Sequence, residues 1–192
     1  MNAYLHRSED RGHVKAGWLE SYHSFSFGSW YNPKYMGVSA LRVINDDRIN
    51  AHNGFGTHSH DNMEILTCVL DGAISHRDTM GNEGQIKAGE WQLMSAGTGV
   101  AHSEINNTDT PVHLLQIWII PDVKEAEPNY QQISLDPRNQ PNEWHLIAGP
   151  DANAPMHIRQ DAEVKAGDAL VFEDNAVIHA NEDSQFIWFD LP

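Results

Sequence analysis

Two histidine-containing segments carry the residues of this sequence that could do chemistry. Residues 54–72, GFGTHSHDNMEILTCVLDG, place His58 and His60 two positions apart. Residues 89–104, GEWQLMSAGTGVAHSE, place His102 and Glu104 at the same interval. Side chains two positions apart on a β-strand project from the same face. Two paired strands could therefore present three imidazoles and one carboxylate to a single ion.

This ligand set predicts one divalent metal ion per chain. Mixed nitrogen and oxygen ligands suit Fe(II), Mn(II), Ni(II), Cu(II) or Zn(II) and resemble the open sites of non-haem iron enzymes. A lone histidine pair in a strand is more often a surface or hydrogen-bonded pair. The prediction therefore depends on two pairs about 40 residues apart, each beside a glycine-rich turn. We expect structural or surface roles for the histidines without such a partner, which are His52, His76, His113, His145 and His157.

The elements that must position these residues are short β-strands. Runs rich in β-branched, aromatic and apolar residues occur at 38–44, 64–70, 114–120, 169–172 and 186–189. Turn signals such as Asn53-Gly54, Asp71-Gly72 and Gly97-Thr98-Gly99 separate many of them. This pattern of short strands and turns predicts an all-β sandwich or barrel, with at most a short helix near 123–126. Cys68 lies in one of the apolar runs, and we expect it to be a core residue.

A weak internal repeat indicates two related units. Residues 87–102 read KAGEWQLMSAGTGVAH and residues 165–179 read KAGDALVFEDNAVIH, and an aromatic strand follows each. The second copy has His179-Ala180-Asn181 where the first has His102-Ser103-Glu104, so it lacks the carboxylate. We therefore predict a metal-binding unit at 1–122 and a shortened, metal-free unit at 123–192, joined by a proline-rich connection.

Composition excludes several classes of function. The chain has 192 residues, with 12 Lys and Arg against 27 Asp and Glu, a formal net charge of −15. So acidic a surface disfavours direct binding to nucleic acid. No apolar run is long enough to span a membrane, and the N-terminus has no apolar core typical of a secretory signal. A single cysteine suits a reducing compartment, so we expect a cytoplasmic protein.

The two histidine segments resemble the cupin motifs. The first reads HxHxxxE and the second G-x5-S-x-G-x4-H-x3-N, with Ser95 where proline is usual. More specifically, the chain is similar to the pirins over residues 1–122. The resemblance is carried by SYHSFSFGSWYNPKYMGVSALRVINDDRI, GFGTHSHDNMEILTCVLDG, MSAGTGVAHSE and LLQIWIIP.

The pirin resemblance implies a bicupin, built from double-stranded β-helix (jelly-roll) barrels, in which only the N-terminal barrel holds metal. It implies His58, His60, His102 and Glu104 as ligands of an ion that is most often iron. It leaves Glu64, a ligand in other cupins, as a neighbour of the metal site. The C-terminal half is shorter than the family pattern around 161–164. A half-barrel exposes strand edges, so we expect a homodimer through this half.

The resemblance implies two functions of different classes. One is a metal-dependent dioxygenase of a flavonol such as quercetin, in which Glu104 is the first candidate to deprotonate the substrate 3-hydroxyl and Phe55, Met63 and Met94 exclude water. The other is an iron-binding, redox-sensing protein that regulates a protein partner without turnover. A sugar-phosphate isomerase has less support, because no lysine or arginine cluster lies beside the histidines to hold phosphate.

Overall fold

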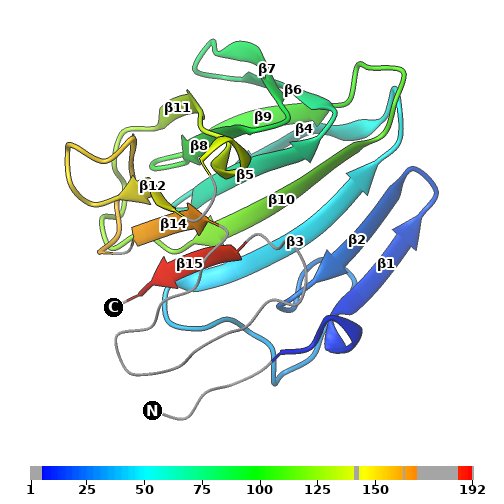
Figure 1. Ribbon diagram of the computed structural model, residues 1–192, viewed down its shortest axis with the longest axis horizontal. Coiled ribbons are helices and arrows are strands. Elements are labelled where there is room, and N and C mark those ends of the chain that lie inside the picture. Colours follow the sequence, from blue (N-terminus) through cyan, green and yellow to red (C-terminus); the bar gives the residue numbers. More distant parts are fainter. Residues whose placement is uncertain (1–5, 141–142, 162, 168–185, 192) are drawn as a thin grey trace.

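A computed structural model describes residues 6–140, 143–161, 163–167 and 186–191, and nearly all the regular secondary structure in this part is β-strand. Its strands form three sheets, shown in Figure 1. The only helices in this part are the short 3-10 turns η1 (Ser8–Asp10) and η2 (Pro137–Asn139). The expectation of an all-β protein is therefore confirmed. None of the described helices could cross a membrane.

The large sheet is antiparallel and has seven strands. Their order is β1 (Gly12–Ala16), β2 (Leu19–His23), β3 (Leu41–Ile49), β10 (Val112–Ile119), β5 (Glu64–Asp71), β8 (Glu90–Ser95) and β11 (Asn129–Ser134). The second sheet has the order β4 (Gly54–His60), β9 (Val100–Ile105), β6 (Ala73–Asp78) and β7 (Glu83–Lys87). The C-terminal sheet has the order β13 (Met156–His157), β12 (Trp144–Gly149), β14 (Glu163–Gly167) and β15 (Phe186–Asp190).

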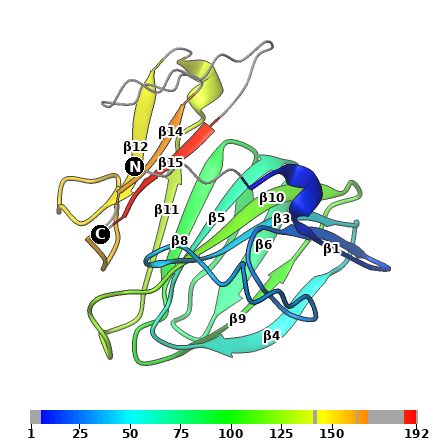
Figure 2. The same ribbon diagram turned by 90° about the horizontal axis from the view of Figure 1, so that it is seen from below.

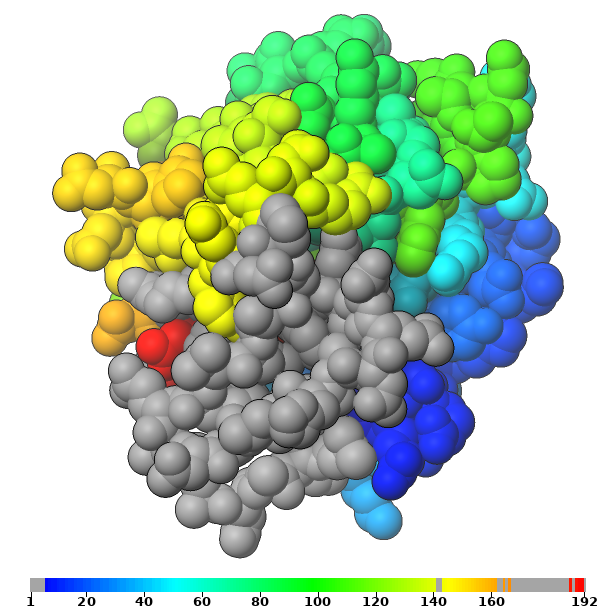
Figure 3. Space-filling view, viewed as in Figure 1, coloured from blue at the N-terminus to red at the C-terminus, as the bar shows by residue number. Residues whose placement is uncertain are grey.

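The three sheets are stacked with the large sheet in the middle, as Figure 2 shows. On one face, Val69 and Leu114 of the large sheet share a core with Ile74 and Ile86 of the second sheet. This sandwich is the arrangement expected of a cupin barrel. The other face packs against the C-terminal sheet, so residues of β12 and β14 belong to one core cluster with residues of β5, β8 and β10. In Figure 3, β1 and β2 (blue) lie on the side of the molecule away from the yellow and orange residues that lead into this sheet.

Strand β5 lies at the centre of the stack and is buried on both faces, from Glu64 to Val69. Its odd-numbered residues face the second sheet, whereas Leu66 and Cys68 face the C-terminal sheet. A strand covered on both sides reads as a continuous apolar run rather than an alternating one. The run at 64–70 therefore marks the middle layer of the molecule.

Some expected elements differ from those observed. The strand expected at 38–44 begins later, at Leu41, and continues to Ile49. At most a short helix was expected at 123–126, and these residues form none, because two of their backbone groups bond to residues outside the segment. Glu125, at φ 54°, donates its N–H to Asn62 Oδ1, and the Ala126 carbonyl accepts the N–H of Thr98.

The predicted division at residue 122 stays a prediction. Strand β11 follows that position in the chain and pairs with β8 of the large sheet, and the sheet β13-β12-β14-β15 follows it. The strand expected at 169–172 and the repeat residues His179, Ala180 and Asn181 lie outside the described residues.

Candidate metal centre

The three predicted histidines meet because β4 and β9 pair in antiparallel register. His58 lies directly opposite His102, and His60 lies opposite Val100. The ring centroids are 4.5 Å apart for His58 and His102, 4.8 Å for His58 and His60, and 5.0 Å for His60 and His102. One ring nitrogen from each lies within 4.8 Å of the others. Strand alternation therefore predicted correctly that these three of the four candidate ligands lie close together.

The protonation of these rings fits a metal site. The Nδ1 atom of His58 lies 2.8 Å from the carbonyl oxygen of Gly56. A carbonyl only accepts, so Nδ1 is the donor and Nε2 is the His58 nitrogen left to bind an ion. Burial and the neighbouring His58 lower the pKa of His60 to about 4, and the same causes lower the pKa of His102 to about 3. Both rings are thus neutral near pH 7.

His102 gives the sharpest indication that something is held here. Its side chain is 1% exposed, and neither ring nitrogen has a hydrogen-bond partner among the described residues. Buried polar atoms without partners are rare in folded proteins and call for an explanation such as an ion. Three imidazoles that converge on one point provide that explanation, because imidazole nitrogens are common ligands of divalent cations.

Glu104 lies on the same face of β9 as His102 but is not part of the three-histidine group. Its carboxyl reaches across to the large sheet, where Gln116 Nε2 donates to it at 2.9 Å and Thr67 Oγ1 at 3.5 Å. Burial raises the pKa of Glu104 to about 7, although these two hydrogen bonds act to lower it. The carboxyl is therefore buried next to the histidines and close to its proton-binding midpoint at neutral pH.

Glu64, expected beside the metal site, lies elsewhere. It is on the face of β5 toward the C-terminal sheet, where Ser95 Oγ donates to its Oε2 at 2.7 Å and the Arg159 backbone N–H donates at 3.5 Å. Thr67, three positions along the strand, projects to the opposite face and meets Glu104. The odd spacing between Glu64 and Thr67 separates them, because side chains alternate along a strand.

A cavity of about 470 Å³ opens beside the histidines. His58, His60 and Glu104 line one side. The aromatic residues Trp18, Phe27, Phe55 and Trp118 line it as well, together with polar residues of the large sheet. Its volume falls within the roughly 300–1,000 Å³ of pockets that hold small molecules. Of the apolar residues expected to exclude water, Phe55 lines the cavity, whereas Met63 and Met94 pack in a separate core cluster with Ile65.

Several residues of the site were missed from the sequence. Asn45 and Asp47 fall in phase with the buried residues Val43 and Ile49 of β3, which is the signal that could have identified them as inward-facing. His76, for which only a structural or surface role was expected, is buried beside the site. It lies opposite Glu104 in the register of β6 and β9, and its Nε2 is 2.9 Å from Asp78 Oδ2.

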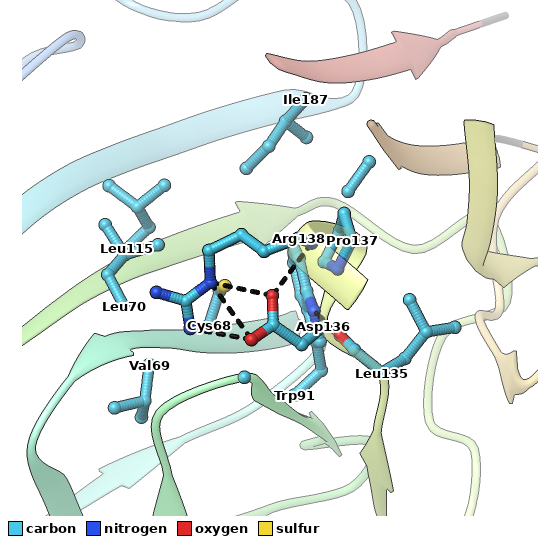
Figure 4. A pocket seen from close by; sticks show the side chains of 12 residues that line it. Cys68, Val69, Leu70, Trp91, Leu115, Leu135, Asp136, Pro137, Arg138 and Ile187 are labelled. Atoms are coloured by element: carbon cyan, nitrogen blue, oxygen red, sulfur yellow. Dashed lines mark hydrogen bonds and ion pairs between the residues drawn. The ribbon is translucent and has the colours of Figure 1, made fainter. Parts of the chain in front are cut away.

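A second cavity, of about 160 Å³, lies on the other face of β5 and is shown in Figure 4. Cys68 lines it beneath an ion pair in which Arg138 Nη2 is 2.7 Å from Asp136 Oδ2. Burial raises the pKa of the Cys68 thiol to about 12. A thiol that stays protonated is a poor nucleophile, so Cys68 is a core residue, as expected.

Comparison with known proteins identifies the family. The sequence model of the family described as pirin matches residues 5–119. The chain is 42% identical over 230 aligned positions to the quercetin 2,3-dioxygenase of Escherichia coli K12, covering 98% of each protein. A putative quercetin 2,3-dioxygenase of Pasteurella multocida is 50% identical over 130 positions, which cover 67% of this chain and 55% of that protein.

The structural comparison agrees. The structure resembles the bacterial pirin YhhW of Escherichia coli in complex with nickel(II), with a TM-score of 0.80 and 47% identity over 85% of this chain and 70% of that one. The alignment with the quercetin 2,3-dioxygenase of Escherichia coli K12 spans 230 positions, which is more than the 192 residues of this chain. That relative therefore has residues without a counterpart here, in line with the shortened C-terminal half. The chain belongs to the pirin family.

Proposed function

We propose that this protein is a metal-dependent dioxygenase of flavonols such as quercetin. In this proposal His58, His60, His102 and Glu104 hold one divalent ion, with iron(II) as the first candidate. The observation that carries the proposal is the convergence of three histidines at the wall of a cavity large enough for an aromatic ligand. The names of the relatives, quercetin 2,3-dioxygenases and a nickel-bound pirin, support the choice of reaction and of a metal.

Glu104 supports the proposal as both a ligand and a proton acceptor. Its carboxyl is buried beside His102, and Gln116 and Thr67 hold it in place. Without the ion, burial raises the pKa of Glu104 to about 7. A bound cation would lower this pKa, and the ionised carboxylate would be the proton acceptor. A bound divalent cation would lower the pKa of a flavonol 3-hydroxyl, as it lowers that of bound water. Glu104 would then accept the proton of that hydroxyl and leave an electron-rich enolate.

The rest of the cavity suits an aromatic substrate. Trp18, Phe27, Phe55 and Trp118 present ring faces and edges that stack on or pack against a planar ligand. They also exclude water from the histidine side, which protects an enolate from simple reprotonation. Dioxygen would react with this enolate, and in quercetin 2,3-cleavage one carbon of the substrate leaves as carbon monoxide.

The test is turnover by protein loaded with a known amount of metal. Iron(II)-loaded and nickel(II)-loaded protein should consume quercetin and dioxygen and release carbon monoxide, and metal-free protein should not. His58→Ala and Glu104→Gln should each lower kcat/KM by at least about 100-fold, since each removes a group that the reaction needs.

His52→Ala is the matched control, because His52 is exposed on a turn, bonds only Asp109 among the described residues, and lies outside the cavity wall. It should keep full activity. If fully metal-loaded protein consumes no flavonol, the dioxygenase proposal is wrong. The redox-sensing alternative would then be the remaining function implied by the family.

A further inference from the structure

Four polar side chains of the large sheet form a second wall of the cavity. Ser21 lies opposite Asp47 in the register of β2 and β3, and His23 lies opposite Asn45. All four are buried, and all four line the cavity that His58, His60 and Glu104 also line. They come from the large sheet, whereas the histidines of the metal site come from the second sheet. This polar wall is therefore separate from the metal ligands.

A chain of hydrogen bonds fixes the direction of each group in the polar wall. His23 Nδ1 is 2.7 Å from Asn45 Oδ1, which only accepts, so Nδ1 is the donor. Ser21 Oγ lies 3.2 Å from the same Nδ1 and accepts from it, which leaves the Ser21 hydroxyl proton for the carboxyl of Asp47. His23 therefore keeps a lone pair on Nε2. The Nε2 atom of His23 is therefore an acceptor on this wall.

Asp47 is the last residue in this series of hydrogen bonds, and one of its carboxyl oxygens has no donor among the residues described. Its side chain is 2% exposed, and its Oδ1 has no hydrogen-bond partner in the described part of the chain. A buried carboxyl oxygen without a donor is unfavourable, and native structures retain such a group where a ligand or water completes it. Asp47 also lines the cavity, so its carboxyl lies at the wall that a bound ligand contacts.

The chemistry of the wall selects the kind of ligand. No lysine or arginine lines the cavity among the described residues, and two carboxyls, Asp47 and Glu104, do. Apart from the proposed metal ion, no cationic group in the described part of this lining would pair with a phosphate or a carboxylate on a ligand. An uncharged ligand that carries O–H donors on an aromatic ring matches both the acceptors of the wall and the aromatic residues around them.

We propose that Asp47, oriented by Ser21, is a positioning residue that accepts a hydrogen bond from a phenolic hydroxyl of the substrate other than the reacting 3-hydroxyl. This inference rests on the proposed flavonol dioxygenase function and concerns which flavonols the site prefers. The polar wall fixes the far ring while the 3-hydroxyl points to the histidines. The site thereby selects polyhydroxylated flavonols over 3-hydroxyflavone, whose only hydroxyl is the reacting one.

The test compares the binding of two flavonols to metal-loaded protein without dioxygen. The dissociation constants of quercetin and 3-hydroxyflavone are measured by quenching of tryptophan fluorescence, since Trp18 and Trp118 line the cavity. Asp47→Leu removes the acceptor and should shrink the preference for quercetin by at least about ten-fold, through weaker quercetin binding alone. Asp47→Asn keeps an acceptor of the same shape and should retain most of the preference. Ser21→Ala frees the carboxyl and should give an intermediate loss.

Thermal melting and metal content identify any variant that fails to fold. If Asp47→Leu fails to fold, Ser21→Ala still decides the question. The role of Asp47 is overturned if the ratio of the two dissociation constants is unchanged in folded Asp47→Leu, or in folded Ser21→Ala where Asp47→Leu does not fold. Equal weakening for both flavonols overturns it as well. That result leaves the proposed function intact if wild-type protein consumes quercetin. A wild-type protein that consumes neither flavonol overturns the proposed function instead.

Discussion

Replacing Glu104 by glutamine should change how the stability of the metal-free protein depends on pH. Burial raises the pKa of Glu104 from 4.5 to about 7 in the folded protein. Between these two values the folded state holds a proton that the unfolded state has lost. The free energy of unfolding therefore falls as the pH rises through this window, and it levels off above pH 7. Glutamine does not titrate, so Glu104→Gln lacks this fall.

The magnitude follows from the size of the pKa change. One pKa unit corresponds to about 1.4 kcal/mol, so wild-type protein should lose about 2–3 kcal/mol relative to Glu104→Gln between pH 5 and pH 8. His60 and His102 act in the opposite direction, because their lowered pKa values make stability rise with pH up to about 6.5. Both proteins contain these histidines, so their contribution cancels in the difference.

The assay is urea unfolding of both proteins at pH 5, 6, 7 and 8 in the presence of a chelator. The difference in unfolding free energy between variant and wild type should grow in favour of the variant up to pH 7 and then stay constant. Parallel pH profiles, with a difference that changes by less than about 0.5 kcal/mol, would refute the idea that Glu104 is a buried carboxyl with a raised pKa.

Three further variants test how the site is held. Gln116→Leu removes the 2.9 Å donor to Glu104 and should weaken metal affinity about 10-fold or more, measured by chelator competition; unchanged affinity would show that this donor does not orient the carboxylate. Gly54→Ala would place a Cβ 2.1 Å from the Glu104 carbonyl oxygen and should cost about 1–3 kcal/mol of stability in urea, whereas Gly56→Ala, with open space at its Cβ, should cost far less. Asn106→Ala removes the amide that donates to the carbonyls of Ile49 and Thr110 and should cost about 1–3 kcal/mol. A smaller loss in urea unfolding would mean that water replaces the amide.

The three histidines could be predicted from the sequence because strand alternation alone fixes their geometry. His58 and His60 share a face at an interval of two, and the glycine-rich turns mark where β4 and β9 begin. The same argument failed for Glu64, because its position depends on which face of β5 meets which neighbouring sheet. A strand buried on both faces has no polar side from which to read its phase.

The polar wall was harder to predict because its residues are polar in strands that otherwise read as core. Asn45 and Asp47 look like turn residues in the run RVINDDRI, and only their phase with Val43 and Ile49 places them inside. Gln116 and Thr67 belong to the site only because they donate to the carboxyl of Glu104, which lies on another sheet. Such contacts depend on long-range pairing, which local sequence patterns do not encode.

The most direct test of the metal centre is a titration of metal-free protein with nickel(II) and with iron(II), followed by calorimetry under anaerobic conditions. Our account predicts one ion per chain for each metal, with binding lost in His102→Ala and retained in His52→Ala. Binding at no defined stoichiometry, or equal binding by His102→Ala, would contradict the claim that the three converging histidines form a metal centre.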